Sequence, residues 1–511
     1  MGTSTVRSYV TCPILNIHIL NNSIILKKSL LAALILFLGI FIVNTTISLL
    51  NAPGQLSVKP VSKYNLDKSA LAENLARAIQ FKTISYENKD SIDYQTFTDM
   101  HNFIRDTYPA LFSNLNVSTI NDYSLIFKWQ GLDSLLDPVV LMAHQDVVPS
   151  GNSDDWTVPP FAGEIIDGFI WGRGALDDKG CMMSLIEATN FLVSTEFKPR
   201  RTLFLVLGHD EEIGGQDGAL AISKSFESKN INPFLILDEG MAIVDGILPG
   251  VEKPVGLIGI AEKGYSTIEL LATSKGGHSS MPPDDASINI LTKGLQVIAE
   301  NPLPADLDGV AKSMFSYLLP QLPLSTRIIF ANQWLFNPLI ISNLENQAET
   351  NALIRTTTAF TTFHSGIKEN VLPVSAQATI NFRLKPGDTI ESVEHHVKTL
   401  IDDLPIQIIQ SNAKFASNPS KISPIDSEGY LLLNKTIRQV FSKTIVAPGL
   451  VLGGTDSRHF ENLTNSIYRF APIVFTSEDL KRMHGLDERI SIENYAMMVQ
   501  FYIQLIKNTS N

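Results

Sequence analysis

Apolar and polar residues along this chain follow two spacings, one typical of helices and one typical of strands. Apolar residues recur at helical spacing over 66–81 and 94–104, which predicts two amphipathic helices. Short, mainly apolar runs at 124–129, 139–143 and 202–208 predict strands that are buried in a sheet. Helices that alternate with such strands are typical of an α/β sheet flanked by helices.

From about residue 263 the pattern changes to a clean alternation of apolar and polar residues. The elements predicted for this stretch are strands at 265–272, 372–384 and 405–410 and helices at 288–299 and 389–404. Such a set predicts a small α+β domain. Residues 328–341 fit neither pattern, because they are uncharged but interrupted by Asn and Pro. That stretch is too broken for a membrane span and predicts either a core helix or the apolar wall of a substrate groove.

Near the N-terminus, residues 30–50 form an uncharged apolar run whose length suits one bilayer crossing. Lys27 and Lys28 precede the run, which favours an N-terminus in the cytoplasm. We expect a signal anchor. A cleaved signal peptide is the alternative, because the densest apolar part ends at Val43, and a buried core helix is the third possibility. Either of the first two places the rest of the chain on the non-cytoplasmic side, as a single-pass membrane protein or a secreted one.

Composition narrows the classes of function. The 511 residues are 44% hydrophobic and 18% charged, which suits a folded chain of two or three domains. A net charge of −12 without a basic stripe argues against nucleic acid as a partner. Cys12 and Cys181 lie on opposite sides of the apolar N-terminal run, which excludes a disulfide framework. Core packing or a metal must therefore hold the fold.

Chemically active residues follow several of the predicted strands. The strand at 139–143 is followed by His144 and Asp146. The glycine-rich loop WGRGALDDKG brings a pair of aspartates to the start of a helix, and two further strands end in the acidic runs DEE and DE. Because the carboxyl ends of neighbouring strands meet at one sheet edge, we expect these side chains to converge there. Unpaired carboxylates at such a place repel one another, and a divalent cation is the usual remedy.

A mixed set of His and carboxylate ligands suits zinc, manganese or cobalt better than calcium. One more nitrogen ligand would complete a pair of metal sites. The candidate is His484 in KRMHG, which follows an apolar strand predicted at 467–475. The gap between Asp238 and His484 is too large for a loop and leaves room for the α+β domain as an insertion.

Nine motifs carry a resemblance to a known family: AHQD, GRGALDDKG, DEEIGG, LDEG, GGHSSMP, NVLP, NFR, GGTDSR and MHG. In order and spacing they resemble the co-catalytic zinc metallopeptidase family of aminoacylase and carboxypeptidase G. LDDKG and GHDEE are similar to the branch of carboxypeptidase S and the N-fatty-acyl-amino-acid synthase/hydrolases. The resemblance runs from about residue 66 to 506. It implies an α/β fold with a zinc-peptidase-like catalytic domain, a mixed sheet flanked by helices, and an inserted α+β lid and dimerisation domain.

Together with the patterns above, the resemblance divides the chain into six segments. They are an N-terminal tail (1–28), a transmembrane signal anchor or signal peptide (29–50), a linker (51–62), the first part of the catalytic domain (63–262), the inserted lid and dimerisation domain (263–415) and the second part of the catalytic domain (416–511).

The resemblance also implies two Zn²⁺ ions per subunit. The five protein ligands it assigns are His144, Asp177, Glu212, Asp238 and His484. Asp177 would bridge both metals, His144 and Asp238 would complete one site, and Glu212 and His484 the other. Glu239, next to Asp238, is the alternative source of that oxygen.

Two further carboxylates acquire catalytic roles by the same resemblance. Asp146 would hold the His144 ring in one tautomer. Glu211 would be the general base that takes a proton from a metal-bridged water and returns it to the leaving amine.

The insert resembles the family's lid, which also forms its dimer interface. His278 would reach over the partner's active site and stabilise the oxyanion, while Asn370, Arg383 and Arg458 are candidates for holding substrate oxygens. Arginine suits this task because it binds a carboxylate through two hydrogen bonds, although Arg383 could equally form a structural salt bridge. Five further histidines are expected to be solvated or core residues, namely His101, His364, His395, His396 and His459.

The implied function is a dinuclear zinc hydrolase that cleaves an amide bond next to a free carboxylate. Its substrates would be N-acyl or N-fatty-acyl amino acids, or the C-terminal residues of short peptides. The expected partners are this small-molecule substrate, a membrane through the N-terminal segment and a second subunit through the lid, with no nucleic acid. The alternative is a catalytically dead, membrane-tethered binding protein on the same scaffold. The intact Glu211 and full ligand set argue against it.

Overall fold

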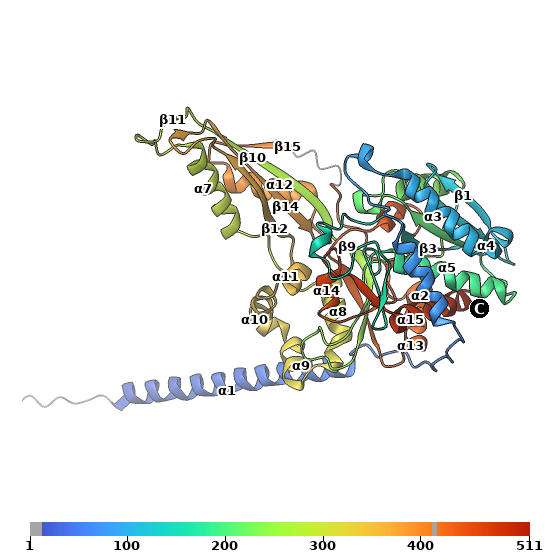
Figure 1. The fold of residues 1–511 in the computed structure, drawn as a ribbon. Coiled ribbons are helices and arrows are strands. Elements are labelled where there is room, and N and C mark those ends of the chain that lie inside the picture. The colour runs from blue at the N-terminus through green and yellow to red at the C-terminus, as the bar shows by residue number, and fades with distance from the viewer. Residues whose placement is uncertain (1–12, 411–415, 511) are drawn as a thin grey trace, which may run out of the picture.

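The computed structural model of the chain describes residues 13–410 and 416–510, and Figure 1 shows their arrangement. A body built on a large mixed sheet carries a smaller sheet that projects from it, and helix α1 (Pro13–Leu50) runs out beneath that projection. The predicted α/β fold, with a helix-flanked mixed sheet and a separate antiparallel sheet, is confirmed. The six segment boundaries stay predictions.

The large sheet contains ten strands within the described residues, in the order β1-β2-β6-β3-β7-β17-β9-β8-β18, with β16 paired to β9. The strands are β1 (Asn116–Ile120), β2 (Ser124–Trp129), β3 (Val139–His144), β6 (Leu203–Gly208), β7 (Leu235–Asp238), β8 (Ile243–Val244), β9 (Val255–Glu262), β16 (Ile445–Val451), β17 (Ile467–Arg469) and β18 (Val474–Phe475). β3 runs parallel to β6 and β7 on either side of it. The carboxyl ends of these three strands therefore meet at one edge, as the sequence predicted.

Residues of β6 show why the central strands are apolar throughout. Leu203, Leu205 and Leu207 pack into the main core on one face of the sheet. Phe204 and Val206 pack into a second core on the other face. Each fully buried side chain of this kind contributes about 1.5–3 kcal/mol to stability.

Helices cover both faces of the large sheet. On the face of the main core lie α2 (Lys68–Ile79), α3 (Tyr94–Thr107), α4 (Pro109–Asn114), α5 (Lys179–Ser194), α13 (Glu428–Val440) and α15 (Ile492–Asn508). On the other face lie α6 (Ala219–Ser228) and the short helix η5 (Asp456–Phe460). A small sheet of β4 (Ile165–Ile166), β5 (Phe169–Trp171) and β19 (Arg489–Ser491) completes the body.

The predicted strand at 467–475 is the main local difference from the sequence patterns. It consists of two short strands, β17 and β18, that pair with different neighbours. Pro472 lies between them and has no N–H to continue a strand ladder.

The projecting sheet is antiparallel, in the order β12-β14-β10-β15. Its elements are β10 (Gly264–Thr273), β12 (Thr357–Ser365), β14 (Ser375–Leu384), β15 (Ile406–Gln410) and the helices α7 (Ser287–Glu300) and α12 (Ile390–Ile401). Alternate residues of β10 and β14 pack with both helices in one hydrophobic cluster. At the end of this sheet farthest from the body, β11 (Gly277–His278) pairs with β13 (Val371–Leu372). We call this whole projection the lid.

Four α-helices connect the lid elements α7 and β12 by way of the body. They are α8 (Gly309–Leu318), α9 (Leu324–Ala331), α10 (Gln333–Glu345) and α11 (Ala348–Ile354). Met314 and Leu318 of α8 pack against β9 and β16. The uncharged stretch 328–341 falls in α9 and α10, and its Ile340 is buried in a small cluster with Ile354. The stretch thus contributes Ile340 to a local core but leaves Trp334, Leu335 and Leu339 exposed, so it is a core helix only in part.

The apolar N-terminal run lies in α1. The window Leu26–Leu50 has a mean hydropathy of 2.5 and is 0% buried, so it is not a core helix. It is long and apolar enough to cross a membrane, which is consistent with a signal sequence or an anchor. Of the two cysteines, Cys181 is buried with a free thiol, and Cys12 lies outside the described residues.

Candidate metal centre

The first group of candidate ligands comes from three separate segments of the chain. Asp177 precedes α5, Glu212 follows β6, and His484 follows β18. The His484 Nε2 atom lies 3.0 Å from Asp177 Oδ2 and 3.5 Å from Glu212 Oε2. One ligand atom from each residue lies within 4.8 Å of the others, which is close enough to hold one metal ion.

The second group shares Asp177 with the first. It consists of His144, Asp177 and Glu239, again with ligand atoms within 4.8 Å of one another. His144 Nε2 lies 3.0 Å from Asp177 Oδ1, the oxygen that does not face His484. Asp177 therefore presents one oxygen to each group, which is the geometry of a bridging carboxylate.

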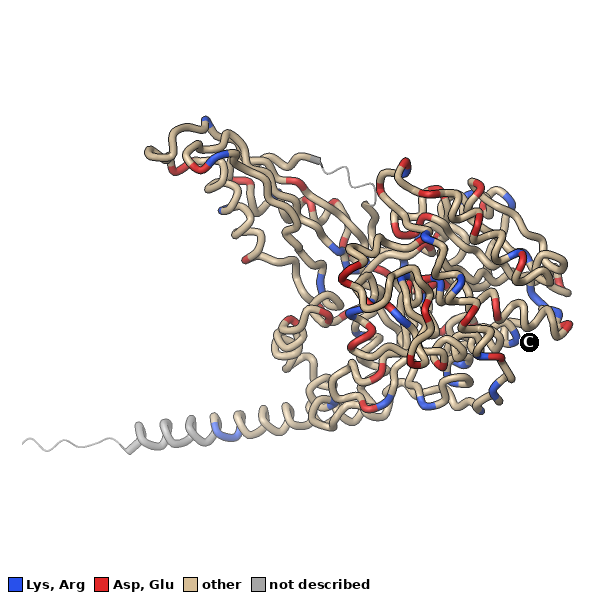
Figure 2. The backbone as a smooth tube through the Cα atoms, viewed as in Figure 1, with Lys and Arg blue, Asp and Glu red and all other residues tan. Residues whose placement is uncertain are grey.

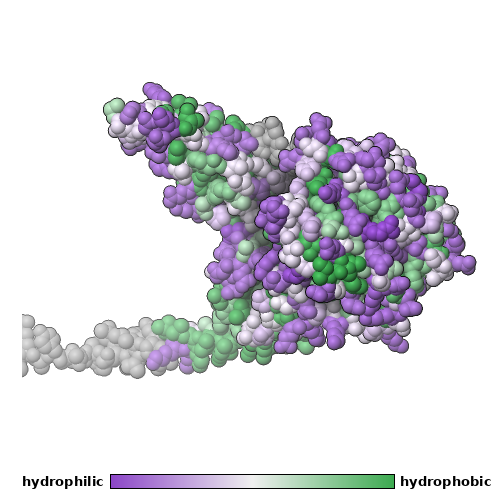
Figure 3. Space-filling model, viewed as in Figure 1, coloured by the Kyte–Doolittle hydropathy of each residue, from purple (hydrophilic) through white to green (hydrophobic). Residues whose placement is uncertain are grey.

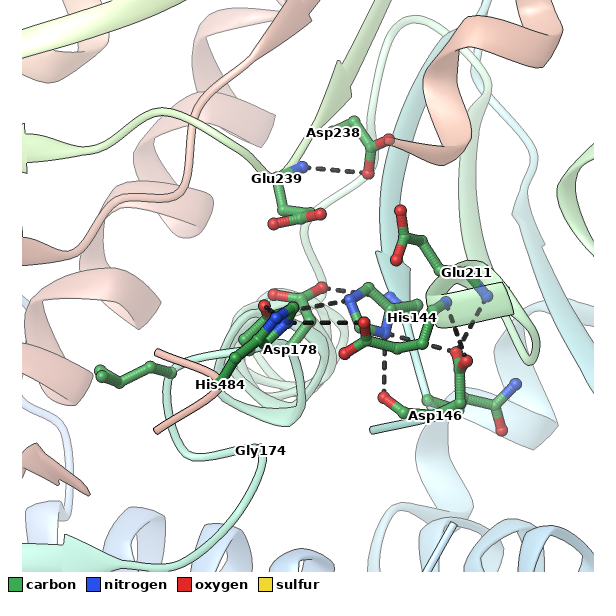
Figure 4. Close-up of polar contacts among 12 residues, drawn as sticks. His144, Asp146, Gly174, Asp178, Glu211, Asp238, Glu239 and His484 are labelled. Atoms are coloured by element: carbon green, nitrogen blue, oxygen red, sulfur yellow. Dashed lines mark hydrogen bonds and ion pairs between the residues drawn. The ribbon is translucent and has the colours of Figure 1, made fainter. Parts of the chain in front are cut away.

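Glu239 lies in the ligand position that the family resemblance assigned to Asp238. The Asp238 carboxylate accepts hydrogen bonds from the backbone N–H of Ser457 at 2.8 Å and from that of Glu239 at 3.0 Å. In Figure 4 the Glu239 carboxylate points toward the other ligands, whereas the Asp238 carboxylate is turned away from them. The geometry thus favours Glu239, the alternative that the sequence left open.

The charges of this site fit divalent cations. Burial raises the pKa of Glu212, and the neighbouring Asp177 raises it further. Burial and the same neighbour raise the pKa of Glu239 well above its usual range. Among the described residues, none donates a hydrogen bond to the buried Glu212 Oε1 atom. Hydrogen bonds with Asp177 and Glu212 raise the pKa of His484 to about 10, a sign of a strongly negative field.

Asp146 connects the histidine ligand to the acidic run that follows β6. Its backbone carbonyl accepts a hydrogen bond from His144 Nδ1 at 2.9 Å, and its carboxylate Oδ1 lies 3.4 Å from the same nitrogen. The carboxylate also accepts the backbone N–H groups of Glu211 and Glu212, both at 3.1 Å. Asp146 therefore fixes the ring of one ligand and the backbone of another. Ser85 Oγ donates a further hydrogen bond to the Asp146 carboxylate at 2.6 Å.

Glu211 belongs to neither ligand group, although it lies beside both. Its carboxylate is near the His144 ring in Figure 4 and lines the cavity described below. Burial raises its pKa well above the usual range, and the carboxylate of Glu212 adds to the shift. A carboxylate that lies outside both ligand groups and has a raised pKa has the properties of a general base.

Glu488 and Arg173 form a buried support that the sequence reasoning missed. Glu488 Oε1 accepts hydrogen bonds from the backbone N–H of Leu176 at 2.8 Å and of Asp177 at 3.2 Å. Its Oε2 accepts one from Arg173 Nη1 at 2.6 Å, and Arg173 Nη2 donates to the carbonyl of Gly485 at 2.9 Å. The pair thus ties the loop of Asp177 to the loop of His484. Its only sequence signal is that Arg173 lies within GRGALDDKG and that Glu488 closely follows MHG.

A cavity of about 560 Å³ opens onto the two groups of candidate metal ligands. It is lined by the ligands Asp177, Glu212, Glu239 and His484, by Glu211, and by the predicted substrate residues Arg383 and Arg458. Apolar side chains line another part of it, namely Met241, Val451, Leu452, Leu480 and Met483. The cavity therefore combines carboxylates, cations and apolar surface within a single chain.

Two more lining residues had no signal in the sequence patterns. The Arg383 guanidinium lies 4.7 Å from the centre of the Tyr265 ring, which holds it against the cavity wall. Lys263 Nζ donates hydrogen bonds to the carbonyls of Ala352 and Arg355 at 2.9 and 2.8 Å. Burial lowers the pKa of Lys263 to about 7.

His278 and Asn370 are the predicted site residues that lie far from the metal-ligand groups of their own chain. His278 lies in β11 at the far end of the lid, and its exposed ring contacts Ser280 Oγ at 2.8 Å. The carbonyl of Asn370, just before β13, accepts a hydrogen bond from Ser279 N, just after β11. Figure 1 shows β11 well apart from β3, where His144 ends the strand.

The other predicted histidines are structural or solvent-facing, as expected. His101 is buried and its Nε2 contacts Gln145 Oε1 at 2.7 Å. His459 Nε2 lies 3.0 Å from the carbonyl oxygen of Gly214. His364 and His395 are exposed, and His396 contacts the carbonyl of Asn301.

Residues 140–508 match the model of the family described as Peptidase family M20/M25/M40, and the chain belongs to this family. It is a metallohydrolase with the α/β fold of that family and the donor groups of a dinuclear metal site.

Similar proteins place the chain more closely within the family. It is 43% identical over 443 residues to "Probable carboxypeptidase S-like 2" of Dictyostelium discoideum, covering 86% of this chain and 85% of that protein. It is also 43% identical over 447 residues to "N-fatty-acyl-amino acid synthase/hydrolase PM20D1" of Xenopus tropicalis, covering 87% and 86%. The crystal structure of an M20 family metallo-carboxypeptidase, Sso-CP2 from Sulfolobus solfataricus, shares the fold, with a TM-score of 0.62, 16% identity, and coverage of 87% of this chain and 100% of that one.

Proposed function

We propose that this metallohydrolase cleaves the amide bond of N-acyl amino acids, and of N-fatty-acyl amino acids in particular. The observation that carries the proposal is the cavity in which the two ligand groups, two arginines and an apolar wall meet. A substrate with an amide flanked by a carboxylate and an acyl chain matches these three surfaces in chemistry. The names of the Dictyostelium and Xenopus relatives point to the same pair of substrate classes, peptides and fatty-acyl amino acids.

Two Zn²⁺ ions are the cofactors that we propose. His144, Asp177 and Glu239 would hold one ion, and Asp177, Glu212 and His484 the other. Imidazole and carboxylate donors suit zinc, which accepts both. When bound, such a pair of cations supplies Lewis acidity that lowers the pKa of water and polarises a carbonyl oxygen.

Glu211 carries the proton in our proposal. Its carboxylate accepts a proton from the attacking water, and it then donates that proton to the nitrogen of the leaving amino acid as the amide C–N bond breaks. Burial and the adjacent Glu212 favour its protonated form, which stabilises the state between these two transfers. Asp146 keeps the Glu211 backbone in place for both steps.

Arg383 and Arg458 are the reason to expect a substrate that carries a free carboxylate next to its amide bond. A guanidinium binds a carboxylate through two parallel hydrogen bonds, and burial strengthens them. Arg458 is fixed by its Nη2 atom, which donates to the Gly214 carbonyl at 3.3 Å, and Arg383 is fixed by Tyr265. We propose that both hold the carboxylate, while Met241, Leu480 and Met483 contact the acyl chain.

The lid residues act on a second copy of the chain in our proposal. His278 and Asn370 lie together at the exposed end of the lid, away from the cavity of their own chain. A homodimer formed through the lids would bring both to the partner's cavity, where His278 would stabilise the oxyanion and Asn370 a substrate oxygen.

We further propose that α1 is a single-pass signal anchor with the catalytic body on the non-cytoplasmic side. Lys27 and Lys28 at the start of the apolar window support this orientation. Cleavage of the segment would instead release a secreted enzyme.

Purified full-length chain should be assayed on N-acyl glycines of increasing acyl length beside Gly-terminated dipeptides. We expect kcat/KM to rise by about fourfold per added methylene until the apolar wall is filled, because burial of each CH₂ stabilises by about 0.8 kcal/mol. Faster cleavage of the dipeptides would favour the second candidate, a carboxypeptidase. Absence of cleavage of both classes would contradict the proposal. N-acyl amines that lack the carboxylate are the matched control and should be poor substrates.

A further inference from the structure

The helices α9 and α10 expose an apolar surface beside α1. The side chains of Leu324, Trp334 and Leu339 are 58%, 51% and 59% exposed, although α1 is in place against these helices. No charged residue occurs between Arg327 and Glu345 in the sequence. A run of this length without charge and with large exposed apolar side chains marks an interaction surface. We call α9 and α10 together the apolar hairpin.

Specific contacts join the apolar hairpin to α1. The Phe37 and Trp334 rings lie 5.4 Å apart between centroids, and those of Phe41 and Phe336 lie 6.4 Å apart. Asn332 Nδ2 donates a hydrogen bond to Thr45 Oγ1 at 2.9 Å. All three α1 residues belong to the window that is apolar enough to cross a membrane. Figure 3 shows hydrophobic surface continuing from α1 onto the adjoining surface below the lid.

The body is held close to the point where α1 ends. Five residues after Leu50, Gln55 Nε2 donates to the carbonyl of Val446 at 2.9 Å, and Gln55 Oε1 accepts the N–H of Val446 at 2.8 Å. Arg438 Nε donates to the carbonyl of Leu56 at 2.7 Å. If α1 lies in a bilayer, this short connection keeps the adjoining surface of the body against the lipid.

The charge distribution leaves one side of the molecule suited to lipid. Figure 2 shows charged residues over the body and at the lid tip, whereas α1 is uncharged beyond Lys27 and Lys28. In Figure 1 the apolar hairpin lies between α1 and the lid. The apolar hairpin is therefore the part of the lid side that lies next to α1, where a bilayer that holds α1 would first meet the folded domains.

We propose that the apolar hairpin is a second membrane contact, which dips into the non-cytoplasmic leaflet beside the α1 anchor. Two short helices with exposed leucine and tryptophan side chains and no charged residue between Arg327 and Glu345 suit the interface of a bilayer, and a tryptophan such as Trp334 favours that depth. The contact fixes how the body stands on the membrane. The inference rests on our proposal that α1 is a membrane anchor, and it is independent of the substrate.

Trp334 is a natural reporter of this contact. The full-length chain is reconstituted in phosphatidylcholine vesicles with either ordinary or brominated acyl chains, and tryptophan emission is compared. Subtraction of the Trp334→Phe variant isolates the emission of Trp334, because Trp129, Trp156 and Trp171 remain in both chains. We expect brominated lipid to remove most of the Trp334 emission. A Leu135→Trp reporter in the Trp334→Phe chain is the control, since Leu135 is 93% exposed on the body, and it should stay unquenched.

Unchanged Trp334 emission in brominated vesicles would overturn the inference. So would equal quenching of the Leu135→Trp reporter, which would mean that the body contacts lipid without preference. Alkaline carbonate extraction of the same vesicles tests the anchor separately, and release of the chain would overturn the anchor and the inference together. Turnover is measured on the same samples, so a failure of the proposed hydrolase activity is seen independently.

Discussion

At the scale of single residues, Asp238 and Glu239 show how two adjacent buried acids divide their tasks. The Asp238 carboxylate accepts hydrogen bonds from backbone N–H groups, whereas the Glu239 carboxylate lies with the candidate ligands His144 and Asp177. A one-residue shift along the chain turns a side chain to the opposite side of a strand end. The family resemblance alone could not choose between them.

This difference predicts distinct outcomes for two isosteric variants. Glu239→Gln should lose one of the two metal ions, because an amide is a far weaker ligand than a carboxylate. Asp238→Asn should keep both ions and destabilise the fold by about 1–3 kcal/mol through the weakened backbone hydrogen bonds. Metal analysis of the purified variants, together with their melting temperatures, checks both. The reverse pattern would return the ligand role to Asp238.

His459 predicts a pH dependence of stability. Burial, with help from the charge of Arg458, lowers its pKa to about 4 in the folded chain. The unfolded chain then binds more protons than the folded chain between about pH 6.5 and pH 4. The contribution of neutral His459 is therefore complete above pH 6.5 and is lost as the pH falls through this window.

Between pH 7 and pH 5 the wild-type chain should lose about 2 kcal/mol of stability that a His459→Gln chain does not lose. Glutamine can still donate a hydrogen bond to Gly214, so it serves as the matched control. Melting temperatures of the two proteins at both pH values measure the difference. Parallel losses in both chains would contradict a buried neutral histidine.

At the scale of elements, the support formed by Glu488 and Arg173 joins two loops that are far apart in the sequence. Both side chains are buried, and together they hold the backbone of Asp177 and of Gly485, the neighbour of His484. Buried groups that orient ligands control metal affinity although they touch no metal.

Glu488→Gln should weaken metal binding by about 10- to 100-fold, because Arg173 keeps a buried charge without its partner and the Asp177 loop relaxes. Competition with a chelator measures the affinity. Glu493→Gln is the control: Glu493 is 69% exposed in its pair with Lys68, and its loss should change nothing measurable. Equal metal affinities of the wild type, Glu488→Gln and Glu493→Gln would show that Glu488 does not support the metal ligands.

The elements themselves were largely predictable. The apolar run at 139–143 and the alternation at 372–384 reappear as β3 and most of β14, because burial on both faces or on one face dictates each pattern. The helices α8 to α11 were not predicted, apart from the uncharged stretch. Their apolar residues serve several small interfaces and so lack one clear period. Glu488 could not be found either, because its role depends on a contact across more than 300 residues.

At the scale of the whole molecule, the cavity and the lid tip belong to the same chain but lie apart. A dimer in which each lid serves the partner predicts complementation between two inactive variants. His278→Ala and Glu211→Gln chains, unfolded together and refolded as a mixture, should recover about one quarter of wild-type activity, since half of the dimers carry one intact site. Each variant refolded alone is the control. No recovery, with mixed dimers present, would place His278 outside the partner's site.

Sequence patterns were enough to predict a helix-flanked sheet and a separate α+β domain, because apolar runs mark the first and a clean alternation of apolar and polar residues marks the second. The path of α1 along the apolar hairpin was beyond prediction, since uniformly apolar segments carry no periodic signal for a specific partner. The same uniformity explains why the anchor and the signal sequence could not be separated by pattern.

The central claim is that paired ligand groups hold two metal ions for a reaction in which Glu211 carries the proton. Its most direct test is the metal content and turnover of the full-length chain beside Glu211→Gln, measured on the same preparations. The account predicts about two zinc ions per chain in both proteins, with turnover in the variant reduced by about 10²-fold or more. A folded, active wild-type chain without bound metal, or a Glu211→Gln chain with full turnover, would contradict it.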